Sequence, residues 1–543
     1  MHFDLVLRNG SIADGTGRRR YPGDIGVSGG RISAVAVPGS LQGERAIDAA
    51  GLVVAPGFID LHSHSDWVLP HPEHDDILAP LLAQGVTTIV AGNCGISPAP
   101  VTDRSTRLAD HSSELLRDDA FPYEWRTMGE WLAALESKGV LLNTGMLVGH
   151  GTIRQAVMGN DPAVPDASRL RALRDETRRA LREGAFGLSA GLAYSPGVFA
   201  KTEELTELAT AVAEEGGVFT VHGRAYTWVS PFYRPMLVGA PHNLRSVREL
   251  TGIAARSRVR LQLSHQIFVG RRTWRTYPAV LRAIDDAAAG GVDVAFDAFP
   301  YTVGNTTVNV LLPDWVLADY RARLRERSVL DRLRREFFLF RHALGLDYRD
   351  ITLLWGAVPE LEPLEGLDFQ AIADRLGMSP FDAYVHMVLA SDGKARVLIG
   401  TYSGDGEDEA PLRAVLAHPR CAFETDTILT RRGKHNPASF GTFPRVLGRY
   451  CRDLGLFSLE EAVRRMTSLP AERIGLEGVG SIAPGKWADL VLFDPAGIAD
   501  RTAAGRTSAA PVGVRSVLIS GEVVMENGAR IPGPRRGRVM RKG

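Results

Sequence analysis

The chain has 543 residues, of which 45% are apolar, and its 63 basic residues are balanced by 63 acidic ones. A chain of this length and apolar content exceeds one ordinary domain and can bury a large core, so we expect a globular protein of two domains. A formal net charge of zero provides no field that would attract nucleic acid or an anionic membrane, and neither is expected as a partner.

Cysteine usage and the N-terminus bear on the compartment. Cys94, Cys421 and Cys451 are too few and too scattered for a disulfide framework, which is typical of a reducing compartment. The first residues, MHFDLVLRNGSIADG, show no charged region before a long apolar run, and no segment reaches the roughly 18 apolar residues of a membrane span. The sequence therefore predicts a cytoplasmic protein.

Short strands broken by glycine turns are expected at both ends of the chain. They are FDLVLRNGSIAD and DIGVSGGRISAVAV at the start, and ADLVLFD and RSVLISGEVVMENGARI at the finish. Asn-Gly and Gly-Gly between alternating apolar residues are hairpin signals. We predict that 1–57 and 478–543 pair into one small β-sandwich domain, and that 58–477 forms the second domain.

Strand candidates alternate with helical patterns between the two ends. The eight candidates are 53–62, 86–92, 141–149, 185–192, 217–223, 259–265, 291–301 and 421–428. In one connection, DASRLRALRDETRRALREG, the residues Leu170, Leu173, Thr177 and Leu181 recur at helical spacing, and Gly184 suits the helix end. Eight strands with intervening helices predict an α/β fold, a (β/α)8 TIM barrel.

A long connection separates the seventh strand candidate from the eighth, and we predict that 313–415 within it is a cap insertion over the barrel mouth. The segment RARLRERSVLDRLRREFF in this connection is a basic helical pattern. Such a pattern suits either a phosphate- or nucleic-acid-binding helix or a solvated helix face. Zero net charge and the acidic residues that follow favour the solvated face.

Side chains that ligate metals follow the predicted strands, at the end of the barrel where TIM barrels carry their active sites. The first strand runs into His62 and His64 in VVAPGFIDLHSHSDW. On one face of a strand, two such histidines would have Cα atoms roughly 6.5–7 Å apart and could share one metal ion. Four other strand ends supply the remaining candidates, which are Cys94 in GNCG, His222, His265 and Asp426.

Each candidate taken alone has an ordinary explanation, since a cysteine is often a small buried residue, a histidine a satisfied core or loop residue, and an aspartate a helix cap. Six ligand-type side chains at the strand ends of one barrel are poorly explained in that way. Imidazole and thiolate suit Zn²⁺, and a carboxylate both ligates metal and moves protons. We therefore expect a zinc-dependent hydrolase with Asp426 as general base and acid.

Several motifs add a family resemblance. PGFIDLHSH after a β-rich N-terminus, with the late GSIAPGKWADLVLFD, resembles the amidohydrolase superfamily, in which a metal-bearing barrel carries a small β domain built from both termini. GNCG, GLSAGLAYSPG, LSH, FPYTVGNTT, LLPDW and GTFPRVLGRY are similar to motifs of its D-aminoacylase (N-acyl-D-amino-acid deacylase) branch. The resemblance covers nearly the whole chain apart from the middle of the insertion, and its most specific part is the cysteine motif.

The resemblance implies cleavage of a linear amide in an N-acyl amine or N-acyl-D-amino-acid-like small molecule. Two alternatives stay open: hydrolysis of a cyclic amide or ester by the same metal site, and a non-catalytic binding protein on a retired barrel. The oligomeric state is also open.

The resemblance further implies how the metal ligands divide. Many amidohydrolases bridge two metals with a carboxylated lysine on strand four, but AFGLSAGL has no lysine, and in the D-aminoacylase branch the strand-two cysteine is a ligand instead. By this likeness the tighter zinc ion is held by Cys94, His222 and His265. A second site would consist of His62, His64 and Asp426. Whether it binds metal more weakly than the first site is left open.

Three departures from that branch concern the substrate. The branch commonly carries a lysine where this chain has Ile267 and an HPR triplet where it has Asn436–Ala438, and these basic residues are expected to hold the substrate's α-carboxylate. The acidic pair that usually follows HxR is also missing from HGRAY. We therefore expect a substrate without a carboxylate at that position. The alternative is that Arg224, Arg431 or Arg432 has taken over its recognition.

Four residues near strand ends are candidates for substrate contact: His150, Tyr194, Arg224 and Tyr301. Arg224 and Tyr301 are favoured among them. The alternative is structural, because both tyrosines could pack at the mouth and Arg224 could pair with a structural carboxylate.

Overall fold

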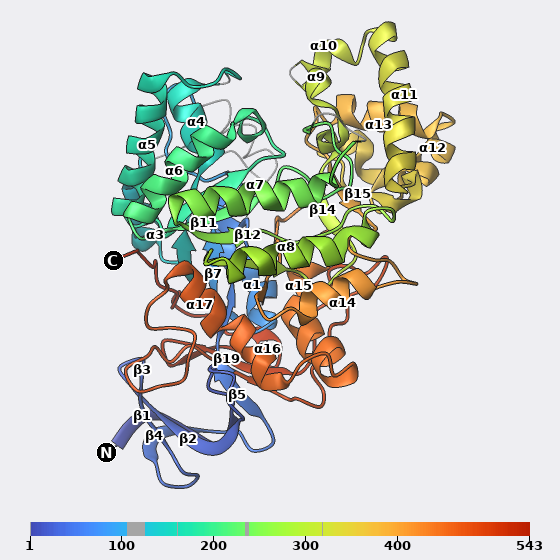
Figure 1. The fold of residues 1–543 in the computed structure, drawn as a ribbon. Coiled ribbons are helices and arrows are strands. Elements are labelled where there is room, and N and C mark those ends of the chain that lie inside the picture. The colour runs from blue at the N-terminus through green and yellow to red at the C-terminus, as the bar shows by residue number, and fades with distance from the viewer. Residues whose placement is uncertain (1, 106–124, 160, 234–237, 318) are drawn as a thin grey trace.

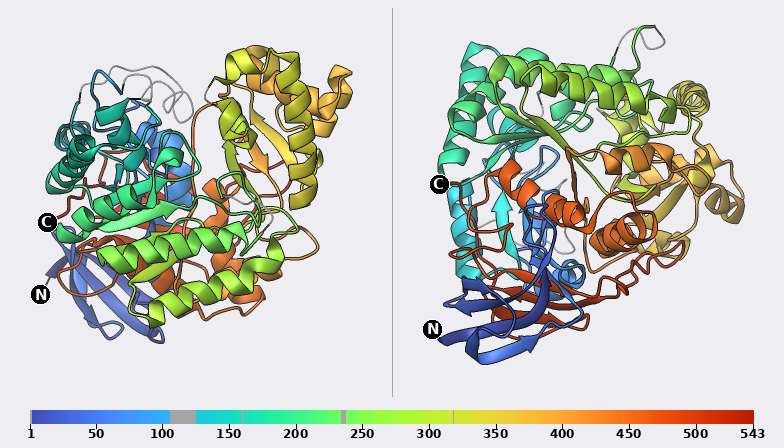
Figure 2. Two further views of the ribbon diagram at one scale, coloured as in Figure 1. Left: turned by 45° about the horizontal axis from the view of Figure 1, so that its top comes forward. Right: turned by 60° about the horizontal axis from the view of Figure 1, so that its bottom comes forward.

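A computed structural model describes residues 2–105, 125–159, 161–233, 238–317 and 319–543. Three parts are visible in Figure 1: a β-rich base to which both ends of the chain contribute, a barrel above it, and an α/β insertion beside the barrel at the far end from the base. The views in Figure 2 show the same base from two further directions, with the first and last strands side by side.

The base is one branched sheet of nine strands in which both chain ends take part. The branch lies at β1, because its first residues pair with β4 and its last two with β5. Apolar side chains from the early and the late strands share one core. The strands are β1 (His2–Ile12), β2 (Tyr21–Ser28), β3 (Arg31–Ala36), β4 (Gln42–Asp48), β5 (Val53–Pro56), β18 (Leu490–Phe493), β19 (Val514–Ile519), β20 (Glu522–Glu526) and β21 (Ala529–Arg530).

The segment predicted as the first barrel strand, 53–62, is divided between two sheets. β5 pairs with β1 and β18 in the base, whereas β6 (Phe58–Asp60) pairs with β7 in the barrel. Gly57 permits this change, because a Cβ at that position would lie only 2.1 Å from Thr87 Oγ1. His62 and His64 therefore lie in the loop after the strand, so strand alternation does not explain their orientation.

Parallel strands form the barrel, as predicted. They are β6, β7 (Val86–Ala91), β8 (Asn143–Met146) continued by β9 (Val148–Gly149), β10 (Gly187–Gly191), β11 (Val218–His222), β12 (Arg260–Leu263), β13 (Val294–Ala298) and β17 (Cys421–Phe423). A parallel bridge between Ser63 and Thr427 joins the first strand end to the last, and the His64 N–H donates to Thr427 O at 2.9 Å. The barrel is thus closed at the end that carries the predicted ligands.

Helices surround the barrel. They are α1 (His74–Ala83), α3 (Met128–Lys138), α4 (His150–Met158), α5 (Ala167–Arg182), α6 (Thr202–Glu214), α7 (His242–Ser257), α8 (Tyr277–Ala289), α14 (Ala410–Ala417), α15 (Ala438–Arg445), α16 (Leu459–Met466) and α17 (Ser468–Ile474). The prediction for α5 is confirmed: Asp166 caps its first turn, and its buried stripe includes Leu173, Thr177 and Leu181. No helix in the described ranges has the length and apolarity that crossing a bilayer requires.

The insertion has its own antiparallel sheet and its own apolar core. Its strands are β14 (Gly304–Thr307), β15 (Ile351–Trp355) and β16 (Arg396–Ile399), and its helices are α9 (Asp314–Leu317), α10 (Tyr320–Arg323), α11 (Arg327–Leu344), α12 (Phe369–Leu376) and α13 (Pro380–Ala390). The predicted range 313–415 does not coincide with the observed insertion at either end. Residue 318 within that range lies outside the described ranges. β14 pairs with β16 and belongs to the insertion, whereas α14 packs on barrel elements β17 and α8.

The basic pattern around α11 is a solvated helix face, as expected. Leu333, Phe337 and Leu344 are buried on one side of the helix. On the other side Arg332 pairs with Glu336 and Arg334 with Asp382. These arginines are paired with acids of the same insertion, so nothing in the arrangement favours a nucleic-acid site.

Candidate metal centre

The structure brings all six predicted ligands together at one end of the barrel. Three overlapping sets each place their ligand atoms within 4.8 Å of one another. These sets are His62, His64 and Cys94; Cys94, His222 and His265; and His62, His265 and Asp426. Since Cys94, His62 and His265 each belong to two sets, the six side chains form one continuous cluster and not two separate groups of three.

Cys94 lies at the middle of this cluster. Its Sγ is 3.4 Å from His62 Nε2, 3.7 Å from His222 Nδ1 and 3.6 Å from His265 Nε2. The last two nitrogens are 2.8 Å apart. Asp426 closes the other side, with its Oδ1 3.5 Å from His62 Nε2 and 3.4 Å from His64 Nε2.

Glycines and a buried serine hold the loop that carries Cys94. A Cβ on Gly95 would lie 2.6 Å from Gly191 N, and one on Gly191 would lie 2.0 Å from Cys94 O. The Ser189 hydroxyl accepts from Gly95 N–H at 3.0 Å and donates to Gly92 O at 2.5 Å. The motifs GNCG and GLSAGL therefore interlock, and only glycine fits at their contact.

Three of the candidate ligands have a backbone conformation that non-glycine residues rarely adopt. The φ angles are 53° at Cys94, 30° at His265 and 46° at Asp426. Such a conformation costs on the order of 1–3 kcal/mol and persists only where surrounding structure fixes it. Backbone strain of this kind clusters at functional sites, which agrees with the side-chain geometry.

Charge within the cluster favours the ionised, metal-binding forms of its two acidic side chains. Burial opposes ionisation of Cys94, but the imidazole of His62 and hydrogen bonds from His222 and His265 hold the pKa of its thiol well below its usual range. Burial likewise opposes ionisation of Asp426, yet His64 and the charges of His265 and His62 keep its pKa below that of an ordinary aspartate. The cluster therefore offers a thiolate and a carboxylate beside imidazoles.

This donor set fits zinc. Burial, together with the neighbouring His265, lowers the pKa of His222 to about 4, so its ring is neutral near pH 7 and has a free lone pair. Thiolate sulfur, neutral imidazole nitrogen and carboxylate oxygen are the ligands that Zn²⁺ takes in proteins. Sγ of Cys94 and the facing nitrogens of His222 and His265 meet at 2.8–3.7 Å, an arrangement that a shared cation satisfies.

Comparison with known proteins agrees with this reading. The profile described as "Amidohydrolase family" matches residues 45–330 and 356–525. The chain belongs to the amidohydrolase family. Over 548 residues it is 32% identical to the D-aminoacylase of Alcaligenes xylosoxydans xylosoxydans, covering 99% of this chain and 97% of that protein.

Two solved structures resemble this amidohydrolase over its whole length. The N-acyl-D-glutamate deacylase from Bordetella bronchiseptica, complexed with zinc and a phosphonate inhibitor that mimics the tetrahedral intermediate, matches with a TM-score of 0.81 at 31% identity and 100% coverage of both chains. A D-aminoacylase studied for the role of its binuclear metal center matches with a TM-score of 0.80 at 31% identity, covering 99% of this chain and 100% of the other.

Tyr194 is the predicted substrate residue that lies against the metal cluster of this amidohydrolase. Its ring centroid is 4.6 Å from that of His222. Burial and the negative charges of Cys94 and Asp426 raise the pKa of its phenol well above the usual value, while a hydrogen bond with the Thr306 side chain acts in the opposite direction. Thr306 belongs to β14, so the insertion reaches the metal cluster at this point.

The other three predicted substrate residues lie in separate hydrogen-bonded groups. The Arg224 guanidinium donates to Glu249 Oε1 and Oε2 at 3.2 and 3.3 Å, and to the carbonyl oxygens of Val198 and Ala200. This arrangement favours the alternative explanation of Arg224, which is pairing with a structural carboxylate.

His150 and Tyr301 are also tied to protein groups. His150 is fully buried, and its Nε2 lies 2.8 Å from Glu204 Oε1, which Arg154 also contacts. The Tyr301 hydroxyl donates to Asp500 at 3.0 Å. None of the contacts described for these two side chains reaches a metal-cluster residue.

Sequence reasoning missed Asp297, Tyr226 and Tyr402, which surround the cluster. Asp297 Oδ1 accepts from His265 N–H at 2.6 Å and faces His62 Nδ1 at 3.5 Å. The Tyr226 ring packs against both His222 and His265. Burial and the charge of Asp426 raise the pKa of Tyr402. For Asp297 there was a signal, because a carboxylate inside the apolar run GVDVAFDAFPY is unusual.

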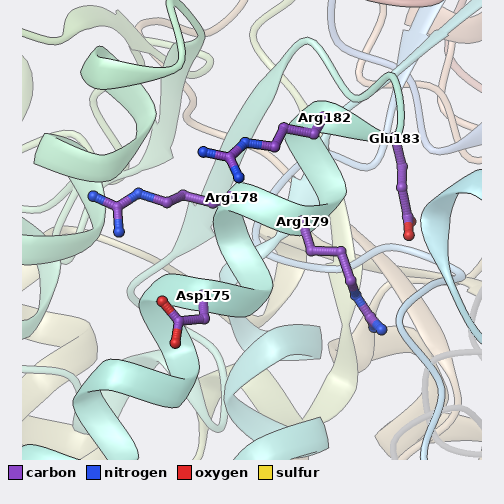
Figure 3. A pocket seen from close by; sticks show the side chains of 5 residues that line it. All are labelled: Asp175, Arg178, Arg179, Arg182 and Glu183. Carbon is purple, nitrogen blue, oxygen red and sulfur yellow. The ribbon is translucent and has the colours of Figure 1, made fainter.

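A surface hollow on α5 is unrelated to this centre. Figure 3 shows the side chains that line it, which are Asp175, Arg178, Arg179, Arg182 and Glu183. Its three arginines form ion pairs with Glu214, Glu176 and Glu215. The hollow lies on the outer ring of helices and contains no ligand-type cluster.

Proposed function

We propose that this amidohydrolase is a zinc-dependent enzyme that cleaves the linear amide of an N-acyl amine or N-acyl-D-amino-acid-like substrate. The observation that carries the proposal is that six ligand-type side chains converge at one end of the barrel. Asp426 is the one carboxylate among these six. The Asp426 side chain is 15% exposed, whereas that of His62 is fully buried. The base is thus the member of the cluster that a substrate entering the mouth can reach.

Cys94, His222 and His265 would hold the zinc ion, and His62, His64 and Asp426 complete the cluster around it. Zinc bound there would polarise the substrate carbonyl and lower the pKa of water to roughly 7, which would permit hydrolysis at neutral pH. The binuclear centre named for the related D-aminoacylase supports a second ion at the same cluster.

Asp426 acts as the general base and acid in this proposal. Its lowered pKa keeps the carboxylate ionised at neutral pH, so it can accept a proton from the attacking water. The same proton then passes to the nitrogen of the leaving amine. His64, 3.4 Å from Asp426 Oδ1, orients the carboxylate for both transfers.

Tyr194 is proposed to bind the substrate beside the metal. Because its pKa is raised, its hydroxyl stays protonated at neutral pH and can donate a hydrogen bond to a substrate oxygen. Its place against His222 sets that donor next to the ligands that would hold zinc.

The neighbouring wall supports a substrate with a neutral or apolar amine portion. Ile267 and Ala438 are buried in one apolar cluster that also contains Phe299. A carboxylate placed there without a paired cation would cost several kcal/mol. Two of the three alternative cations are engaged, since Arg224 pairs with Glu249 and Arg431 with Glu73.

A hydrolysis screen of the zinc-loaded protein tests the proposal. It compares carboxylated N-acyl compounds, neutral N-acyl compounds, and cyclic amides and esters. We expect turnover of linear N-acyl compounds and none of the cyclic ones. Turnover restricted to cyclic amides or esters would replace this proposal with the other hydrolase activity, and no turnover of any class would contradict the assignment as an enzyme.

A further inference from the structure

A directional chain of buried hydrogen bonds crosses the barrel interior and ends at the metal cluster. Arg473 Nε donates to Gln262 Oε1 at 3.3 Å, and Gln262 Nε2 donates to Asp297 Oδ2 at 2.8 Å. Asp297 Oδ1 accepts from the His265 backbone N–H at 2.6 Å and lies 3.5 Å from His62 Nδ1. The chain thus connects α17 to two of the proposed metal ligands.

Every member of this chain is withdrawn from solvent. Gln262, Asp297 and His62 have no exposed surface, and Arg473 is 9% exposed. Gln262 is in register with Thr220 on β11, and Asp297 with Ala422 on β17, so neighbouring strands fix the height of both side chains in the barrel. Arg473 is anchored in turn by Asp293 and by the Leu261 carbonyl.

The chemistry of the side chains fixes the direction of the chain. A guanidinium only donates, so Gln262 must turn its amide oxygen toward Arg473 and its amide nitrogen toward Asp297. Asp297 therefore faces N–H groups from both Gln262 and His265, and an ionised carboxylate, which only accepts, satisfies both. An asparagine at position 297 could accept from one of them but would face the other with a second donor.

We propose that Asp297 is a positioning residue of the metal centre, which holds the His265 backbone and directs the His62 ring through this chain. The inference rests on the proposed zinc site. His265 has a φ of 30°, a conformation that needs an external partner, and the short bond to Asp297 supplies one. A carboxylate facing Nδ1 of His62 fixes which nitrogen carries the proton and leaves Nε2 toward Cys94. Partners of this kind orient metal ligands, and their loss commonly weakens metal affinity about 10–100-fold.

Three variants separate positioning from folding. Asp297→Asn removes the charge and creates the donor conflict with Gln262. The double variant combines Asp297→Asn with Gln262→Glu. The carboxylate introduced at position 262 then accepts from both Arg473 and the amide introduced at position 297, so the hydrogen bonds are restored while the charge moves away from His62. The matched control is Glu204→Gln, which neutralises another buried carboxylate of the same barrel that contacts His150 and Arg154.

The measurements are zinc affinity by chelator competition, the visible absorption spectrum of the cobalt-substituted protein, and the unfolding temperature. We expect Asp297→Asn to bind zinc about 10–100-fold more weakly with an altered cobalt spectrum. The double variant should regain the unfolding temperature but not the zinc affinity, and Glu204→Gln should retain wild-type zinc affinity.

Two results would overturn the inference. One is wild-type zinc affinity and cobalt spectrum in Asp297→Asn, and the other is recovery of zinc affinity together with stability in the double variant, which would reduce Asp297 to a folding role. Absence of zinc binding in the unchanged protein would instead contradict the proposed function itself, so the two failures are distinguishable.

Discussion

The metal cluster and the apolar wall beside it differ in how they are built. Each side chain of the cluster is placed by the end of a barrel strand or the loop that follows it, and the ligands contact one another directly. The wall combines Ile267 and Ala438 of the barrel with the core of the insertion. Under the proposed function, the chemistry belongs to the barrel, whereas recognition depends on how an added domain packs against it.

The largest expected effect comes from removing the ligand at the middle of the cluster. Cys94→Ala should lose tightly bound zinc and nearly all activity, because Cys94 contacts three of the histidines. The fold should remain, since alanine and cysteine have the same difficulty with the φ of 53° at this position. Metal analysis of the purified variant and its circular dichroism check both parts, and a normal zinc content would remove Cys94 from the ligand set.

The second effect separates proton transfer from metal binding. Asp426→Asn keeps the side-chain shape but cannot accept the proton, so kcat should fall about 10²–10⁴-fold. Zinc at the site proposed for Cys94, His222 and His265 should stay bound. Steady-state kinetics with parallel zinc analysis tests this, and an unchanged kcat would mean that another residue is the base.

A third variant changes the wall and leaves the cluster intact. Ile267→Lys places a cation in the apolar wall, so the ratio of kcat/KM for a carboxylated substrate to that for its neutral analogue should rise by about 10-fold or more, the scale of one charge-assisted hydrogen bond. Ile267→Met is the matched control without a charge. If both variants change the ratio equally, the wall at Ile267 does not face the substrate's amine portion.

The smallest effect on activity is expected at Arg224. Arg224→Met breaks the nearly buried pair with Glu249, whose side chains are 9% and 13% exposed, so the free energy of unfolding should fall by about 3–5 kcal/mol. Because we assign Arg224 no part in substrate recognition, the KM of the variant should stay close to the wild-type value while its free energy of unfolding falls. Denaturant unfolding and kinetics together decide this: a large rise in KM with normal stability would restore Arg224 as a substrate residue.

Several parts of the molecule follow from the sequence because their signals are local. Glycine turns between alternating residues mark the terminal strands, and α5 combines an apolar stripe with a capping Asp166. The six candidate ligands stand out in the sequence because histidine, cysteine and aspartate rarely recur directly after apolar strands. Strand ends of one barrel meet at one rim, so a one-dimensional pattern was enough to predict the cluster.

Other features depend on contacts between distant segments. The sequence near Gly57 contains no signal that β5 and β6 enter different sheets, because the cause is the close approach of Thr87, which is distant in sequence. The insertion begins with the polar strand Gly304–Thr307, which has no apolar alternation and is defined by pairing with β16. His150 and Tyr301 stand near strand ends, but their partners Glu204 and Asp500 are more than one element away.

The ratio of kcat/KM for N-acetyl-D-methionine to that for its neutral amide, measured with the zinc-loaded wild-type protein, tests the central claim most directly. Our account, a retained metal centre beside a wall without a cation, predicts hydrolysis of the N-acetyl group with a higher kcat/KM for the neutral amide. A clear preference for the free acid would show that the carboxylate is still recognised and would contradict the account.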